Sequence, residues 1–262
     1  MRGGGIQGRK LSGVSTLCAP ELAALVRNAM HATGEDSQAQ RRQLGLAAAQ
    51  GDANAQYMLG LMHRVGEGGP EDCAEARRLF GLAAAQGYAV AQKALGDMHH
   101  VGEGGPVDLA EAGRWYGLAI AQGDAGAQYK LGCMHHNGDG GPVDIAEARR
   151  LFGLAAAHGD AEAQCMLGNL HRSGHGGPVN FTEARRLYGL AAAQGNASVQ
   201  CMLASMHYKG EGGPQDFAEA SRLYGLAAHD AWRRDHVHRV HGSPEDAPCP
   251  AVRPLTVQIF RV

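Results

Sequence analysis

The stretch GLAAAQGDANAQYMLGLMHRVGEGGPEDCAEARRLF, residues 45–80, decides the fold because the chain repeats it. Its opening motif returns at Gly81, Gly117, Gly153 and Gly189, each time 36 residues further on. Five units therefore follow one another in phase: 45–80, 81–116, 117–152, 153–188 and 189–224. Self-similarity at such a period is the signature of a stacked repeat protein, so it outweighs any local reading of the sequence.

The first part of each unit predicts an amphipathic helix. In unit one, Ala55, Leu59 and Met62 recur at spacings of four and three residues, which places them on one face of an α-helix. The pattern ends at Gly66 in VGEGGP, where glycine can adopt a left-handed conformation and Pro70 prevents the helix from continuing.

A second helix is predicted to begin at Asp72 and to close near Gly87. Asp72 and Glu75 have the spacing of a capping box, in which each side chain accepts from the other residue's backbone amide. The same pair recurs in the later units as Asp108/Glu111, Asp144/Glu147, Asn180/Glu183 and Asp216/Glu219. Because the pair is repeated at helix starts, we interpret it as capping chemistry rather than as paired catalytic carboxylates.

Glycine lies inside both kinds of predicted helix, as Gly60 does in a first helix, with equivalents Gly96, Gly132 and Gly168, and as Gly81 does in a second helix. A glycine within a helix costs about 1 kcal/mol relative to alanine. We expect the cost to be offset by close approach of a neighbouring backbone, consistent with the alanine-rich helix faces.

Helix pairs of this kind cannot bury their apolar faces alone, so they are expected to stack. The prediction is an all-α fold, a right-handed αα-solenoid over residues 21–231. A degenerate helix at 35–50 and an amphipathic helix at 21–31 are expected to cover its N-terminal edge. Residues 1–20 are predicted to be a disordered leader and residues 232–262 a disordered tail.

The repeats resemble those of the Sel-one-like repeat (SLR) family, relatives of tetratricopeptide repeats. The segments AVAQKALGDMHHVGEGG (89–105) and DLAEAGRWYGLAIAQG (108–123) carry the resemblance. Two departures recur: histidine replaces the usual tyrosine, and leucine replaces the usual basic residue before Ala-Ala. The histidines are His63, His99, His135, His171 and His207, and the leucines are Leu82, Leu118, Leu154 and Leu190.

The resemblance implies an adaptor that gathers other proteins. One secreted branch of the family pairs cysteines within each repeat, and β-lactam binding or hydrolysis has been assigned to some of its members. Here the cysteines of the repeats fall singly, at Cys73, Cys133, Cys165 and Cys201. That placement disfavours the secreted hydrolase, which remains an alternative together with a purely structural array that has no selected partner.

Composition and charge exclude several function classes. The formal net charge is −2 and no basic block occurs, which argues against nucleic-acid binding. No apolar run is long enough to span a membrane. The first twenty residues lack the apolar core of a secretory signal, so we expect a cytoplasmic and monomeric protein, with an acid-poor organelle transit peptide as the alternative.

No metal, cofactor or catalytic site is expected. Equivalent histidines of successive repeats lie on helices at least about 8–10 Å apart, too far to share one zinc ion. We interpret the histidine column as packed, aromatic-like side chains, and His236, His238 and His241 as incidental. The sequence has no nucleophile elbow and no phosphate loop, so the chain is predicted not to be an enzyme.

One face of the first helix varies between units while its neighbours stay constant. In the SLR fold the first helices line the concave surface, so this face is the candidate groove for a protein or peptide partner; a merely solvated face is the alternative. Its residues are Tyr57, Met58, Leu61, Lys93, Asp97, Tyr129, Lys130, Cys133, Cys165, Met166, Asn169, Cys201, Met202 and Ser205.

Deleting residues 153–188 should leave the array folded, because it removes one whole period and restores every junction between neighbours. Deleting half of that length should cause misfolding, because a first helix would then lie where a second must pack. Circular dichroism and thermal unfolding of the two deletions distinguish these outcomes, and equal stability of both would contradict the repeat assignment.

Overall fold

The computed structural model describes the backbone of residues 34–241 and the side chains of residues 36–229. The described part is all-α and contains no strand. Its helices are α2 (Gly34–Ala49), α3 (Ala53–Val65), α4 (Cys73–Ala85), α5 (Ala89–Val101), α6 (Leu109–Ile120), α7 (Ala125–Asn137), α8 (Ile145–Ala157), α9 (Ala161–Ser173), α10 (Phe181–Ala192), α11 (Ala197–Lys209) and α12 (Phe217–His241). The predicted helix at 35–50 is α2, whereas the leader, the predicted helix at 21–31 and residues 242–262 lie outside the described residues.

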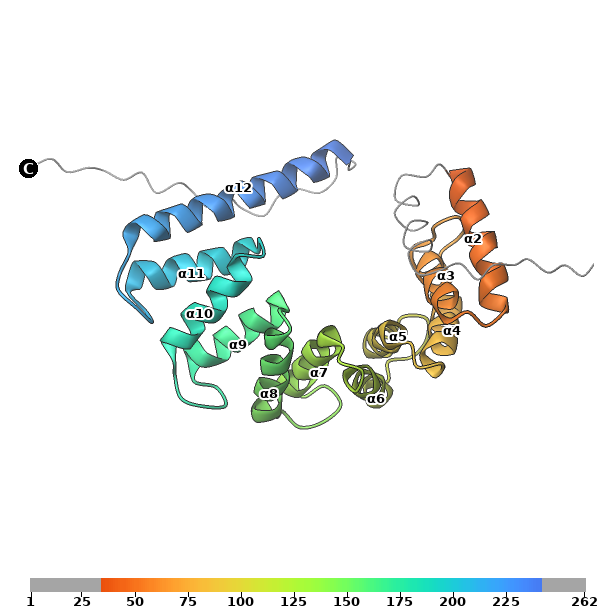
Figure 1. Ribbon diagram of the computed structural model, residues 1–262, viewed down its shortest axis with the longest axis horizontal. Helices are drawn as coiled ribbons and strands as arrows, with labels where there is room; N and C mark the ends of the chain where they lie inside the picture. The colour runs from red at the N-terminus through yellow and green to blue at the C-terminus, as the bar shows by residue number, and fades with distance from the viewer. Residues whose placement is uncertain (1–33, 242–262) are drawn as a thin grey trace, which may run out of the picture.

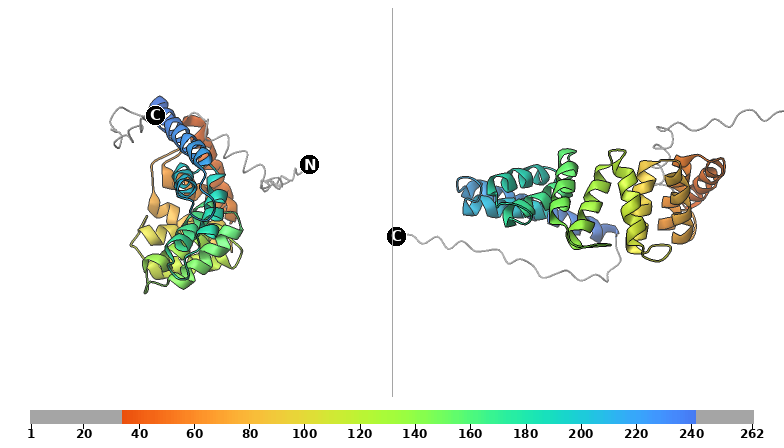
Figure 2. Two further views of the ribbon diagram at one scale, coloured as in Figure 1. Left: turned by 90° about the vertical axis from the view of Figure 1, so that its left-hand side faces the viewer. Right: turned by 90° about the horizontal axis from the view of Figure 1, so that it is seen from below.

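The helices pair along the chain and follow an arc (Figure 1). The pairs α3–α4, α5–α6, α7–α8, α9–α10 and α11–α12 each pack closely, and each second helix also contacts the first helix of the next pair. The first helix lies toward the inside of the arc, most clearly for α5 over α6. Figure 2 shows the pairs stacked one after another along the long axis. The predicted repeat array of helix pairs is therefore confirmed.

Each second helix begins at a polar N-cap, as predicted, but the capping is not reciprocal. The Asp72 carboxylate accepts from the Glu75 backbone amide at 2.9 Å. The Glu75 carboxylate accepts instead from the guanidinium of Arg78, at 2.7 Å. The Asp72 amide donates to the His63 carbonyl, at 2.8 Å. The predicted return bond from Glu75 is therefore wrong, because the amide it would satisfy already has a partner.

The last helix is longer than predicted. We expected the helical region to stop at residue 231, where the repeat pattern fails, yet α12 continues to His241. Neither glycine nor proline occurs between Leu226 and Gly242, so nothing in this segment interrupts backbone hydrogen bonding. The end of a repeat pattern marks the end of stacking, and it need not coincide with the end of a helix.

An aromatic ring against a glycine is the central contact of the helix pair. Phe80 is fully buried, and a Cβ added to Gly60 would lie 2.6 Å from its ring. The same contact joins Gly96 to Tyr116, Gly132 to Phe152 and Gly168 to Tyr188. The predicted close approach is therefore real, but a side-chain ring makes it rather than a neighbouring backbone.

The glycine inside the second helix of each pair has different surroundings. A Cβ added to Gly81 would meet nothing within 4 Å, and the same holds for Gly117, Gly153 and Gly189. The expectation of close packing at these positions is wrong, because this face of the second helix is open.

Arginine–histidine contacts join successive pairs. Arg41 Nη2 on α2 donates to Nδ1 of His63 on α3, at 2.7 Å. The other three contacts of this kind are Arg77 to His99 (2.6 Å), Arg149 to His171 (3.0 Å) and Arg185 to His207 (2.7 Å). Because a guanidinium has no acceptor, each of these imidazoles must be neutral at the contacting nitrogen. The histidines are thus polar partners of arginine, and not only packed side chains as we expected.

The arginines also bind the glycine-rich loops. Arg77 Nη1 donates to the Pro106 carbonyl at 3.3 Å, and Arg185 Nη1 donates to the equivalent Pro214 carbonyl at 3.2 Å. Each arginine therefore ties together the second helix of one pair, the first helix of the next and the loop that follows it.

Gly60→Ala should destabilise the protein by about 1–3 kcal/mol, because the added methyl group overlaps the Phe80 ring. Gly81→Ala should stabilise it by about 1 kcal/mol, because the methyl group enters open space and alanine is the better helix former. Urea unfolding of the two variants measures both effects. A loss of stability in Gly81→Ala would show that its open surroundings are misjudged.

Acidification should lower the melting temperature. Burial, and next the facing arginine, lower the pKa of four histidines below the ordinary value of 6.5: His63, His99, His171 and His207. The unfolded chain therefore binds more protons than the folded one, and stability is lost as the pH falls below about 6.5. Thermal unfolding between pH 7.5 and about pH 5.5 avoids most carboxylate titration.

Glutamine is the matched replacement, because its carbonyl oxygen accepts a hydrogen bond without titrating. The variant with all four histidines changed to glutamine should lose most of the pH dependence in that range. An equally steep dependence in the variant and the parent protein would contradict the assignment.

Candidate functional site

The predicted groove residues lie on the first helices of the five pairs, from α3 to α11. Of the fourteen, Lys130 and Cys201 are exposed and the others are half-buried. Most of this face is therefore engaged in packing within the array. The binding role of the face stays a prediction.

One column of equivalent positions on this face varies because of a contact within each helix pair. Its residues are Leu61, Asp97, Cys133, Asn169 and Ser205, and each precedes the aromatic residue of its own pair by 19 positions: Phe80, Tyr116, Phe152, Tyr188 and Tyr224. The column residue is polar in the three units whose aromatic residue is tyrosine: Asp97, Asn169 and Ser205. It is less polar in the two units whose aromatic residue is phenylalanine: Leu61 and Cys133.

Hydrogen bonds explain this correlation. The Tyr116 hydroxyl donates to the Asp97 carboxylate at 2.7 Å, and the Tyr188 hydroxyl donates to the Asn169 amide oxygen at 2.6 Å. A buried hydroxyl without a partner is costly, whereas phenylalanine needs none. Comparison of the units with one another could have revealed this pairing from the sequence alone.

The tyrosines of the face also pack internally. Tyr57 contacts the rings of Phe80 and Tyr88, with centroids 5.5 and 5.6 Å away. Tyr129 contacts Phe152 at 5.8 Å. Burial raises the pKa of Tyr57 and Tyr129 above the ordinary range of tyrosine. These tyrosines of the candidate groove therefore also take part in the packing of the array.

Part of the predicted face surrounds a cavity between α5 and α7. This cavity, of about 290 Å³, is lined by four predicted residues: Asp97, Tyr129, Lys130 and Cys133. The lining also contains side chains that the sequence reasoning missed, among them Arg64, His100 and Asp139. They come from the ends of first helices and from the following loop, and only their positions in the stack bring them together.

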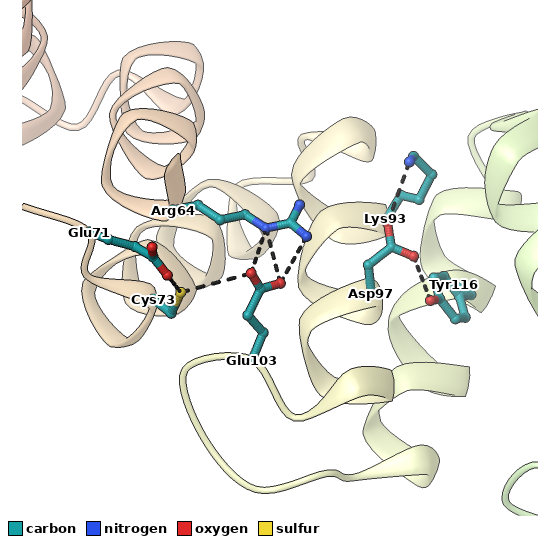
Figure 3. A network of polar contacts seen from close by, with 7 residues as sticks. All are labelled: Arg64, Glu71, Cys73, Lys93, Asp97, Glu103 and Tyr116. Carbon is teal, nitrogen blue, oxygen red and sulfur yellow. Dashed lines mark hydrogen bonds and ion pairs between the residues drawn. The ribbon is translucent and has the colours of Figure 1, made fainter. Parts of the chain in front are cut away.

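The charges around this cavity form short pairs. Arg64 binds Glu103 at 2.8 Å, and Lys93 lies 3.6 Å from Asp97, which also accepts from Tyr116 (Figure 3). The Nε2 atom of His100 lies 3.3 Å from the carboxylate of Asp139. The Lys130 ammonium has no such ion pair among the described residues, and lies over the Tyr129 ring at 5.9 Å.

The cysteines of the described chain are all unpaired thiols: Cys73, Cys133, Cys165 and Cys201. Burial is the main cause that raises the pKa of Cys133 and Cys165 above the ordinary thiol value. Within residues 34–241, no three histidine, cysteine, aspartate or glutamate side chains gather in a way that could hold a metal ion. None of the helices described is both long and apolar enough to cross a membrane.

Solved structures of similar proteins share this architecture. A Sel1 repeat protein from Oxalobacter formigenes is 29% identical with a TM-score of 0.69, over 81% of this chain and 85% of the other. A protective antigen of uropathogenic Escherichia coli strains, with an SLR fold, is 29% identical with a TM-score of 0.69, over 85% of this chain and 53% of the antigen. The chain thus spans about half of the antigen's length.

More distant structures share the fold alone. An immunity protein from Pseudomonas aeruginosa is 18% identical with a TM-score of 0.56, over 86% of this chain and 88% of the other. A search of curated proteins finds no match.

The Sel1 repeat model matches five consecutive segments: residues 53–88, 89–124, 125–160, 161–196 and 197–230. Each segment begins with a first helix, eight residues later than the unit boundary we chose at Gly45, so one matched segment contains one helix pair. Together they cover more than half of the 262 residues, and the chain therefore belongs to the Sel1 repeat family.

Proposed function

We propose that the protein is a scaffold that binds a protein or peptide partner on the inner face of its arc. The observation that carries the proposal is the cavity between α5 and α7, where four of the predicted groove residues meet. Lys130 is exposed there and lacks an ion-pair partner among the described residues, so its charge is available to an acidic group of the partner.

The lining suits a polypeptide better than a small apolar ligand. It combines the cations of Arg64 and Lys130 with the carboxylates of Asp97 and Asp139, beside the Tyr129 ring. Tyrosine and arginine are both enriched at protein contact surfaces. The half-buried Met166 and Met202 continue the face along α9 and α11, where flexible side chains can adapt to a partner.

We propose further that the chain does not act as an enzyme. A nucleophilic cysteine needs a lowered pKa, whereas burial raises that of Cys133 and Cys165. Unpaired thiols at the described cysteines also speak against the cysteine-paired, β-lactam-binding branch.

A structural array without a selected partner is the second candidate. It is favoured by the hydroxyl pairing of Asp97 and Asn169, because internal hydrogen bonds account for variation that we first ascribed to binding. The test therefore has to use a residue of the cavity that is not part of this pairing.

Lys130→Glu should weaken binding of the native partner about tenfold, because it replaces an unpaired cation in the cavity with an anion. Its matched control is Arg150→Glu on α8, which makes the same change of charge at an exposed residue paired with Glu147. Partners captured by proximity labelling in the native cell would be purified, and their affinity measured for both variants.

Arg77, Arg149 and Arg185 are unsuitable controls because they join successive pairs. Equal affinity of Lys130→Glu and the parent protein for every captured partner would contradict the groove. A loss of binding only in Arg150→Glu would move the contact to the outer face.

A further inference from the structure

The junction between α6 and α7 lacks an arginine that the other four junctions have. Gly113 occupies the position of Arg41, Arg77, Arg149 and Arg185, while the facing histidine, His135, is retained. Among the described residues no hydrogen bond reaches the ring of His135, whereas the equivalent histidines of the other four junctions contact a guanidinium.

A cavity of about 340 Å³ lies at this junction. Its lining includes Gly113, His135, Asp139, Gly141 and Pro142. The glycine directly before the loop proline shows that the space a guanidinium would occupy is open. A Cβ added there would meet the arginine guanidinium in each of the other four junctions, at Gly69, Gly105, Gly177 and Gly213, but at Gly141 it meets nothing within 4 Å.

The acceptors that hold the guanidinium in the other junctions are also present here. His135 corresponds to the imidazole that accepts from arginine, and Pro142 to the loop prolines, such as Pro106, whose carbonyls accept from Nη1. Asp139 corresponds to Glu67 and His175, whose carbonyls accept from Arg41 and Arg149.

The charge and shape of the cavity suit a cation on an aliphatic stem. The lining holds no arginine or lysine, and it contains Asp139, whose carboxylate also faces His100, and Asp144, whose carboxylate also caps α8. Leu131 and Met134 lie 4.0 Å from a Cβ placed on Gly113, where the arginine stem begins in the other junctions. Gly113 is partly exposed and Gly141 is exposed, so a group from solution can reach the space.

We propose that this cavity binds a guanidinium group supplied from outside the chain, which takes the place of the missing arginine. A planar guanidinium matches the acceptors because its donors are arranged as a fixed fork, whereas an ammonium has no such geometry. The site is separate from the inner-face cavity, with which it shares only Asp139 in the lining, and it stands independently of the proposed scaffold role.

The test is an NMR titration of the full chain with labelled histidine, with acetyl-arginine amide as the probe. We expect saturable shifts of the His135 ring, and binding weaker by about tenfold for acetyl-citrulline amide, which has the same shape without the charge. Acetyl-lysine amide tests the preference for a guanidinium over an ammonium and should also bind more weakly.

Two variants localise the site. Gly113→Arg fills the cavity from within, so it should abolish the His135 response and raise the melting temperature. Arg77→Gly opens the equivalent space at the α4–α5 junction, so it should add a second response at His99 and lower the melting temperature until the probe is added. The Arg77→Gly response also shows whether the assay detects a vacated guanidinium site.

A further arm distinguishes the sources of the group. Tighter binding of acetyl-arginine amide than of free arginine and agmatine supports an arginine side chain of a protein, and the reverse order supports a free guanidino compound. Absence of a response at His135 when Arg77→Gly does respond at His99 would overturn the proposal. Equal binding of the arginine and citrulline probes, or binding that survives in Gly113→Arg, would overturn it as well.

Discussion

The contact between an aromatic ring and a glycine sets the geometry on which the array depends. Phe80, Tyr116, Phe152 and Tyr188 are buried against first-helix glycines that leave no room for a Cβ. This contact fixes how closely the two helices of a pair approach, and the pair is the unit that is stacked. Since four of the five pairs share this contact, the junctions between pairs are also similar, and in four of the five an arginine, a histidine and a loop meet in the same way.

The choice between tyrosine and phenylalanine in that ring extends to the inner face. A tyrosine hydroxyl reaches the inner side, where Asp97 or Asn169 accepts its hydrogen bond. The inner face therefore has two components. One set of residues accepts hydrogen bonds from the tyrosine hydroxyl groups of the core. The other set, which includes Lys130, takes no part in these hydrogen bonds. Variation between repeats is thus evidence of binding only at positions whose variation is not explained by hydrogen bonds within the array.

The sequence predicted the features that depend on neighbours along the chain. The period, the helix starts at Asp72 and its equivalents, and the helix ends at Gly66 and its equivalents follow from local rules, and the structure has them. The groove residues were placed correctly on the first helices. Their role as a binding surface remains a prediction.

Features that depend on distant residues were beyond the sequence. The Arg77–His99 contact joins residues 22 positions apart on two helices, and its geometry follows only from the stacking. The Glu75 return bond is lost because of the loop within the pair, whose conformation lets the His63 carbonyl accept from the Asp72 amide. The length of α12 was missed for a different reason, because we let the end of the repeat stand for the end of the helix.

The glycine at position 113 also has a mechanical consequence. In a curved array of helices, bending is easiest at a joint that lacks a cross-link, and the α6–α7 joint lacks the guanidinium contact of the other four. This joint is the third of five and divides the arc near its middle (Figure 1). A small rotation at a central joint moves both ends through long lever arms. A force that pulls the two ends of the arc apart should therefore bend the array mainly at the α6–α7 joint.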